Sequence, residues 1–146
     1  TRVGEASGQP FDLAFFDREG FVYDTEPACR AVVTMRRRSP EKALELLARV
    51  SRAFYAENRD VTKPAELAKV AAELGEDAEA FELAMLDPET RNATHRDFLL
   101  AQQSGVSGFP CLVVGREADG YALVTSGFTQ LEHLIEPLET WYAAHS

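Results

Sequence analysis

The chain has 146 residues, the length of one domain, with 45% hydrophobic and 27% charged residues, as in ordinary soluble globular proteins. Its formal net charge of -9 argues against a nucleic-acid-binding surface, because such surfaces need clusters of Lys and Arg that displace counterions. The one basic cluster, Arg36 to Arg38, is explained by the C-terminal end of a helix, where cations are favoured. With no apolar run long enough to span a bilayer and no signal-peptide core, we expect a soluble protein that binds no membrane.

Cysteine and histidine spacing excludes the common metal and redox motifs. Cys29 and Cys111 lie far apart, with no C-x-x-C and no His/Cys spacing typical of zinc. We therefore predict no metal site and no cofactor, and we expect both cysteines to be reduced, buried and unpaired. His95, His133 and His145 have no partner at a useful spacing, so we expect them to be solvated rather than catalytic.

The first 24 residues give weak signals. The polar start up to Pro10 is typical of a loop, and residues 11–24 mix aromatic and charged residues, which predicts a short helix or turn. A clear helix follows from Asp24 or Thr25, with Glu26 in its first turn and an apolar face made by Ala28, Val32 and Met35. Asp24 and Glu26 could form a catalytic carboxylate pair, but their place at a helix start explains them without catalysis.

Four more helices are predicted before residue 105. They begin at capping or proline residues, which are Ser39-Pro40, Thr62, Asp77 and Asp87-Pro88. Gly75 and Gly105 fit left-handed stops. Apolar residues recur at helical spacing: Ala43, Leu47, Val50 and Phe54 in the first, Leu67, Val70, Ala71 and Leu74 in the second, Phe81 and Met85 in the third. The middle of the chain is therefore predicted to be all helical.

After Gly105 the pattern changes to strands. "CLVVG" at 111–115 is typical of a buried strand, "READG" of a turn and "YALVTS" at 121–126 of a second strand, so a β-hairpin is predicted. Thr129 and Glu132 have the spacing of a capping box that starts a last helix. Its apolar stripe comprises Leu131, Leu134, Ile135, Leu138, Trp141 and Tyr142, and Pro137 predicts a kink or a break within it.

Proline before the first strand carries the most specific signal. Gly108-Phe109-Pro110 removes one ladder N–H at the strand start, and a cis X–Pro bond there would turn the chain sharply. Together with "GQPF" at 8–11, "YDTEPACRAV" at 23–32, "FYAENRDVTKPAELAKVAAELG" at 54–75 and "GFTQLEHLI" at 127–135, this makes nearly the whole chain resemble the DsbA-like thioredoxin superfamily. Within it, the chain is most similar to the cytoplasmic branch of predicted protein-disulfide isomerases related to FrnE.

The resemblance implies an α/β, thioredoxin-like fold that is mostly helical, because a large all-α domain is inserted into it. We expect residues 1–104 to form the helical region and residues 105–146 a C-terminal β-β-α half, within one compact unit. In that family a cis-proline loop faces the catalytic C-x-x-C. By carry-over, Gly108, Phe109 and Pro110 are the substrate-binding positions, and a cytoplasmic location is expected.

One departure from the family pattern limits this reading. Family members begin with a strand, a helix that holds the C-x-x-C and a second strand, none of which is in this sequence. Without a low-pKa thiolate at a helix start there is no nucleophile for disulfide exchange, so no catalytic residue is expected in this chain. Because a two-stranded hairpin is marginal alone, we expect the missing strands to be encoded upstream, or a second copy to complete the sheet as a homodimer.

Both cysteines have two readings. Cys111, directly after Pro110, could be an accessory thiol that traps a mixed disulfide, or simply a small apolar residue that starts a buried strand. Cys29 would be activated by the helix dipole only if it were exposed, and its neighbours Ala28 and Val32 predict partial burial instead.

Three functions remain open from the sequence. The first is a thiol–disulfide oxidoreductase or isomerase whose redox motif lies outside this chain and whose substrate is an extended peptide that pairs beside Pro110. The second is a non-redox, peptide-binding or chaperone-like module that uses the same loop. The third is the glutathione-dependent isomerase branch, which "GFTQLEHL" disfavours because it lacks the G-x-D-R-like sequence typical of that branch.

Overall fold

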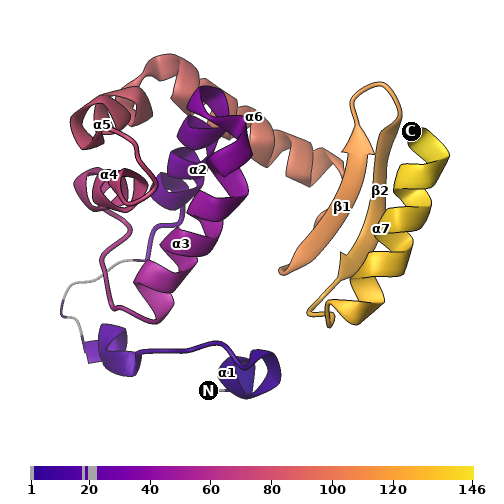
Figure 1. Cartoon of the computed structure of the whole chain (residues 1–146), viewed down its shortest axis with the longest axis horizontal. Helices are drawn as coiled ribbons and strands as arrows, with labels where there is room; N and C mark the ends of the chain where they lie inside the picture. Colours follow the sequence, from indigo (N-terminus) through magenta and orange to yellow (C-terminus); the bar gives the residue numbers. More distant parts are fainter. Residues whose placement is uncertain (1, 18, 20–22) are drawn as a thin grey trace. The chain divides into compact units, whose positions relative to one another are not determined.

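A computed structural model describes residues 2–17, 19 and 23–146. Helices dominate, and the described part holds one two-stranded antiparallel sheet (Figure 1). The elements in chain order are α1 (Arg2–Ser7), the 3-10 helix η1 (Leu13–Asp17), α2 (Glu26–Arg38), the 3-10 helix η2 (Pro40–Lys42), α3 (Ala43–Tyr55), α4 (Pro64–Ala72), α5 (Ala78–Leu86), α6 (Pro88–Gln103), β1 (Cys111–Arg116), β2 (Gly120–Ser126) and α7 (Glu132–His145). The chain divides into two compact units, Thr1–His95 and Arg96–Ser146.

The first unit is held together by an apolar core between α2, α3, α4 and α5. Its largest fully buried side chains include Phe81, Met35, Leu46, Leu67 and Met85. These residues come from four different helices, so each helix is stabilised mainly by burying one apolar face against the others. The five predicted helices of the middle region are all present, as α2 to α6.

The buried face of α3 differs from the predicted one by one position. Leu47 was expected in the core, but its side chain is 48% exposed, while Leu46 is fully buried. The predicted Ala43, Val50 and Phe54 are buried, together with Leu46 and Ala53, and this spacing fits a helix as well as the predicted one. On α2, the core residues are Ala31 and Met35, and the predicted Val32 is only half-buried.

Helix starts were predicted correctly where an aspartate precedes the helix. Asp77 accepts a hydrogen bond from the Ala80 N–H at 2.8 Å, and Asp87 accepts one from the Glu89 N–H at 2.8 Å. Asp24 also accepts a hydrogen bond from the Glu26 N–H, at 3.0 Å, although Thr25 is the N-cap residue of α2 and its own side chain makes no capping bond. Ser39 was expected to cap α3, but the 3-10 turn η2 intervenes and the Ser39 hydroxyl bonds the Glu76 carboxylate instead.

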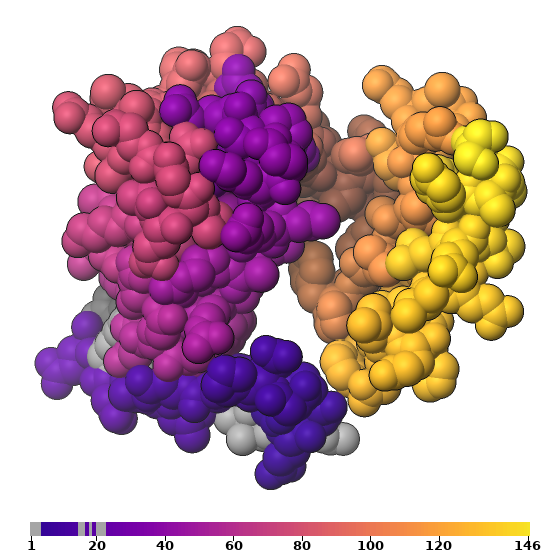
Figure 2. Space-filling view, viewed as in Figure 1, coloured from indigo at the N-terminus to yellow at the C-terminus, as the bar shows by residue number. Residues whose placement is uncertain are grey.

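The start of the chain is more ordered than a loop. Residues 2–7 form the helix α1, contrary to the sequence-based expectation, and η1 matches the short helix expected after residue 11. Residues 18 and 20–22 of that stretch lie outside the described part. The Asp12 N–H donates to the Tyr55 carbonyl, and the Phe11 and Tyr55 rings lie 5.4 Å apart between centroids. These contacts attach the N-terminal segment, indigo in Figure 2, to the end of α3.

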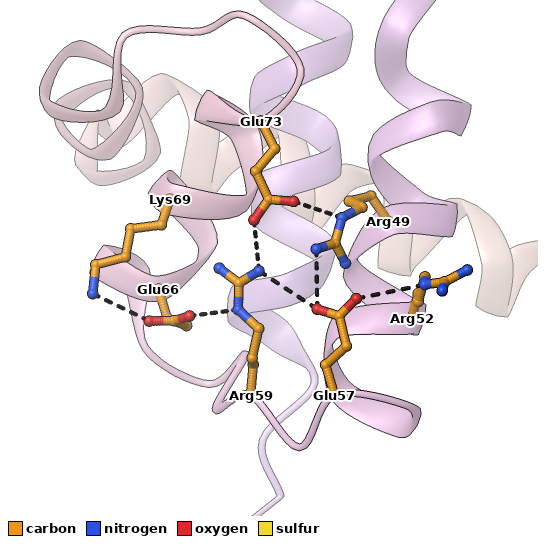
Figure 3. A network of polar contacts seen from close by, with 7 residues as sticks. All are labelled: Arg49, Arg52, Glu57, Arg59, Glu66, Lys69 and Glu73. Carbon is orange, nitrogen blue, oxygen red and sulfur yellow. Dashed lines mark hydrogen bonds and ion pairs between the residues drawn. The ribbon is translucent and has the colours of Figure 1, made fainter. Parts of the chain in front are cut away.

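A network of ion pairs joins the end of α3, the following loop and α4 (Figure 3). Arg59 is at its centre and contacts Glu66 and Glu73, both at 2.6 Å. Arg49 contacts the same Glu73 at 2.6 Å and Glu57 at 3.0 Å. Two shared arginines therefore link carboxylates that are up to 16 positions apart in the sequence (57 to 73). Such a shared arrangement holds its geometry better than isolated surface pairs do.

This network predicts a loss of stability in acid. Hydrogen bonds from Arg59 lower the pKa of Glu66 and of Glu73 below the ordinary glutamate value of 4.5, and one from Arg49 lowers the pKa of Glu57. A lowered folded-state pKa stabilises the fold above pH 4.5, and this contribution is lost as the pH falls through the lowered values. We expect the urea concentration at the midpoint of unfolding to decrease as the pH is lowered below 4.5. In Glu73→Gln this decrease should be smaller. A variant with an equally steep acid dependence would contradict this role of Glu73.

The second unit contains the predicted hairpin and last helix. β1 and β2 pair in an antiparallel register from Cys111 opposite Ser126 to Arg116 opposite Gly120, with an irregularity between Leu112 and Val113. The apolar run of β1 was expected to be buried, but it is only half-buried, because within the described part the sheet has two strands and α7 packs on one side of it.

The last helix differs from prediction at its start and at its proline. The capping box does not form: α7 begins at Glu132, and the Thr129 hydroxyl bonds the Thr125 hydroxyl at 2.7 Å instead. Pro137 lies inside α7 without breaking it. Leu134, Leu138 and Trp141 are half-buried, whereas the rest of the predicted stripe is exposed, namely Leu131, Ile135 and Tyr142.

Contacts of Arg116 with Trp141 and His145 join this helix to the hairpin. The Arg116 guanidinium lies 5.8 Å from the centre of the Trp141 ring, and the Arg116 side chain also donates to the His145 carbonyl. The His145 ring stacks on Trp141 with centroids 4.3 Å apart. The expectation that His145 is simply solvated was therefore wrong.

Candidate active site

The predicted substrate-binding loop lies at the start of β1 in the second unit. The Phe109–Pro110 peptide bond is cis, as the family resemblance implied. The Pro110 carbonyl accepts a hydrogen bond from the Gly127 N–H at 2.8 Å, which fixes the loop against the segment that follows β2. Gly127 has a φ of +95°, a left-handed conformation that favours glycine and turns the chain after β2.

Phe109 is the most exposed large apolar side chain among the described residues, at 91%. It stands beside Pro110, which is also exposed, while Gly108 is half-buried. Phe128, directly after Gly127, is 56% exposed. Phe109 and Phe128 leave apolar surface in water on two segments that the Pro110–Gly127 hydrogen bond joins, which makes this loop a candidate contact surface.

Phe128 and Gly127 were missed as site residues by the sequence analysis. They follow β2, 17 or more positions after Pro110, and only the antiparallel pairing of β1 with β2 brings the two segments together. The available signal was the glycine itself, because a glycine between a strand and a helix often marks a left-handed turn.

Cys111 occupies the first position of β1, beside this loop. It is half-buried, opposite Ser126, and forms no disulfide. Cys111 therefore begins a strand, as expected if it has only a structural role. Its thiol is also partly accessible to solvent, as an accessory thiol must be.

Cys29 was expected to be partly buried, but it is exposed on α2. The two faces of this helix are divided so that Ala28 and Ala31 lie toward the core and Cys29 toward solvent. The pKa of Tyr23 is raised above its ordinary value, first by partial loss of hydration although the side chain is 49% exposed, and then by the hydrogen bond with Tyr55 and the nearby Cys29 thiol. Tyr23 also stacks on Phe54 at 4.7 Å. This aromatic cluster is explained by the packing of the residues before α2 against α3.

The remaining candidates are accounted for by structure. Glu26 pairs with Arg30 one helical turn away, at 3.1 Å, as a residue of a helix start does. His95 and His133 are exposed on α6 and α7. Residues 2–17, 19 and 23–146 contain no group of three or more His, Cys, Asp or Glu placed to hold a metal ion. No helix in the same ranges is long and apolar enough to cross a membrane.

Comparison with known proteins assigns the family. The model of the DSBA-like thioredoxin domain matches residues 2–138. No curated protein matches the chain. Among solved structures, a candidate protein disulfide isomerase from Nitrosomonas europaea is 39% identical, with a TM-score of 0.90, over 99% of this chain and 71% of its own.

A second solved structure is the cytosolic disulfide reductase DsbM from Pseudomonas aeruginosa. It is 29% identical, with a TM-score of 0.78, over 98% of this chain and 73% of its own. DsbM has also been solved with glutathione, and that structure matches at 28% identity with a TM-score of 0.77 over 97% of this chain and 72% of its own. The family model alone covers most of the chain. This chain therefore belongs to the DSBA-like thioredoxin domain family, whose fold here is mostly helical, with a helical insertion and a small two-stranded sheet.

Proposed function

We propose that this chain carries the substrate-binding portion of a thiol–disulfide oxidoreductase, and that the reacting dithiol is supplied from outside these 146 residues. The observation that carries the proposal is the exposed Phe109, held at the start of β1 beside the Pro110–Gly127 hydrogen bond. The family match and the two disulfide-exchanging neighbours support the class of reaction.

The substrate would be an extended peptide that contains a disulfide or a thiol. Its backbone would lie against the segment Gly108 to Pro110, and one of its apolar side chains would cover the Phe109 ring. Backbone hydrogen bonds to a fixed edge tolerate many sequences, and an exposed aromatic ring adds affinity without demanding a particular residue. This combination suits an enzyme that acts on many cysteine-containing segments.

In the reducing direction, a thiolate of the external dithiol attacks one substrate sulfur. A mixed disulfide forms and the second substrate sulfur leaves as a thiolate. The second thiol of the pair then attacks the mixed disulfide and releases the substrate as a dithiol, so that the enzyme pair becomes a disulfide. Two glutathione molecules would reduce that disulfide and form one oxidised glutathione. The glutathione-bound structure of DsbM supports this choice of reductant.

The peptide-binding step can be tested without the dithiol. We expect the 146-residue chain to bind an extended peptide whose cysteine is blocked, as measured by fluorescence anisotropy. Phe109→Ala should weaken binding by about tenfold, because truncating an exposed aromatic anchor removes a large part of an interface's affinity. Tyr142→Ala, which removes a 71% exposed ring on α7, is the matched control and should leave binding unchanged. Equal affinity of Phe109→Ala and the unchanged chain would contradict the proposed site.

The origin of the dithiol has a separate test. In an insulin-reduction assay with glutathione, the chain alone should give no rate above the glutathione background. A rate that disappears in Cys111→Ser would place the nucleophile within this chain and overturn that part of the proposal. Mass spectrometry after incubation with a peptide disulfide would then show the mixed disulfide at Cys111.

A non-redox binding module is the second candidate. It is favoured by the sequence itself, which has only Cys29 and Cys111 and no C-x-x-C. The two candidates differ in the response to a dithiol partner: an oxidoreductase portion accelerates disulfide exchange when a C-x-x-C thioredoxin segment is added, and a binding module does not. A peptide complex without any such acceleration would favour the module.

The sheet of the second unit leaves apolar side chains exposed. β1 and β2 form a two-stranded sheet within the described residues, and Tyr121 and Leu123 of β2 are exposed, at 45% and 65%. Further strands or a second copy of the chain would cover such apolar side chains. The homodimer stays a prediction, and sedimentation of the chain tests it. A cytoplasmic location and the division at residue 104 also stay predictions.

A further inference from the structure

A hollow of about 560 Å³ lies in the first unit, between the N-terminal segment and α3. Pro10 and Phe11 form one side of it, and Ala48, Arg52 and Tyr55 of α3 form the other. Its volume falls within the range of small-molecule binding sites. None of its lining residues belongs to the loop proposed to bind the peptide substrate.

Most of the hollow is lined by carbon. The Phe11 and Tyr55 rings meet at a tilted angle of 59°. Ala48, about two turns before Tyr55 on α3, lines the hollow with a small side chain that leaves space beside the helix. The Ser51 hydroxyl donates a hydrogen bond to the Leu47 carbonyl at 2.9 Å, so it does not offer a donor to a ligand in the hollow. An occupant would therefore place an apolar body here.

Among the described residues that line this hollow, Arg52 is the cation, and its ion pair is weak. The Arg52 side chain is 68% exposed and contacts Glu57 at 3.5 Å. The same Glu57 is held by Arg49 at 3.0 Å and by Arg59 at 3.7 Å, and those two side chains are only 23% and 21% exposed. Arg52 can leave Glu57 without leaving that carboxylate uncompensated (Figure 3). Its guanidinium is then available to a ligand carboxylate, with which it forms charge-assisted hydrogen bonds.

We propose that this hollow binds a small monocarboxylate with an aromatic or aliphatic body. The body lies against Phe11, Ala48 and Tyr55, and the carboxylate lies on Arg52. Neutral ligands of the same shape bind more weakly, because they lose the ion pair. This site is independent of the proposed oxidoreductase function and needs no dithiol.

The test uses the 146-residue chain, with 3-phenylpropionate and its neutral amide as probes. In an NMR titration we expect saturable shifts on Phe11 and Tyr55, with the acid bound about tenfold more tightly than the amide. Arg52→Gln should remove the difference between acid and amide. Arg91→Gln, which removes an exposed arginine on α6, is the charge-matched control and should retain it.

A filling variant tests the cavity itself. Ala48→Leu changes an exposed position of α3, where leucine is a good helix former, so the fold should persist while binding of both probes is lost. Equal affinity for acid and amide would overturn the role of Arg52. Shifts confined to residues 96–146, or no saturable binding, would overturn the site.

Discussion

Phe81→Ala should lower the free energy of unfolding of the first unit by about 3–5 kcal/mol, the largest effect we predict. The Phe81 side chain is completely buried in the core between the helices. Its truncation removes apolar area from the core and leaves a cavity that its neighbours fill only in part, since they are held by four separate helices. Urea unfolding followed by circular dichroism at 222 nm measures the change, because the first unit is mostly helical.

The control for this variant lies on the same helix. Leu83 lies two positions after Phe81 on α5, is 64% exposed and is not part of the core cluster, so Leu83→Ala should change the stability by less than about 0.5 kcal/mol. A similar loss in both variants would contradict the predicted role of Phe81. Alanine itself favours the helix, so an exposed Leu83→Ala substitution has no reason to cost as much as emptying a core position.

Gly115→Ala should destabilise the hairpin of the second unit by about 2–3 kcal/mol. A Cβ added at Gly115 would lie 2.3 Å from the Gly120 carbonyl oxygen and 2.7 Å from the Tyr121 Cα. Both obstacles are backbone atoms of the paired strand, so no side-chain rotation relieves the clash and the strands must separate. The single tryptophan, Trp141, reports the change, because Arg116 of β1 lies over its ring.

The effect on function should follow the effect on the hairpin. β1 begins at Cys111, directly after the proposed substrate loop. Separation of the strands at Gly115 should therefore also weaken the hydrogen bond between the Gly127 N–H and the Pro110 carbonyl. We expect Gly115→Ala to weaken peptide binding together with the change in Trp141 emission. Gly108→Ala is the control for stability and Trp141 emission alone, since a Cβ there meets nothing within 4 Å but Gly108 belongs to the proposed substrate loop. Normal Trp141 emission in Gly115→Ala would contradict the predicted clash.

Local patterns in the sequence determined most of the secondary structure of this protein. Aspartates before helices, prolines in first turns and glycines at helix ends act within a few residues, so Asp77, Gly75 and Gly105 were read correctly without the fold. The hairpin was also predicted, from its strand and turn residues, and these signals depend on neighbours along the chain. The cis form of the Phe109–Pro110 bond was implied by the family resemblance instead, since most X–Pro bonds are trans and the tertiary fold must impose the cis form.

Tertiary structure decided which faces are buried and which polar groups meet. Leu46 and Leu47 both fit a helical stripe, and only the packing of α2 and α4 on α3 selects Leu46. Thr129 and Glu132 have the spacing of a capping box. The Thr129 hydroxyl nevertheless forms a hydrogen bond with the hydroxyl of Thr125, a residue of β2. The ion pairs of Arg59, the contact of Pro110 with Gly127 and the hollow beside Arg52 all join segments distant in sequence, because packing energies depend on position in space and not on spacing along the chain.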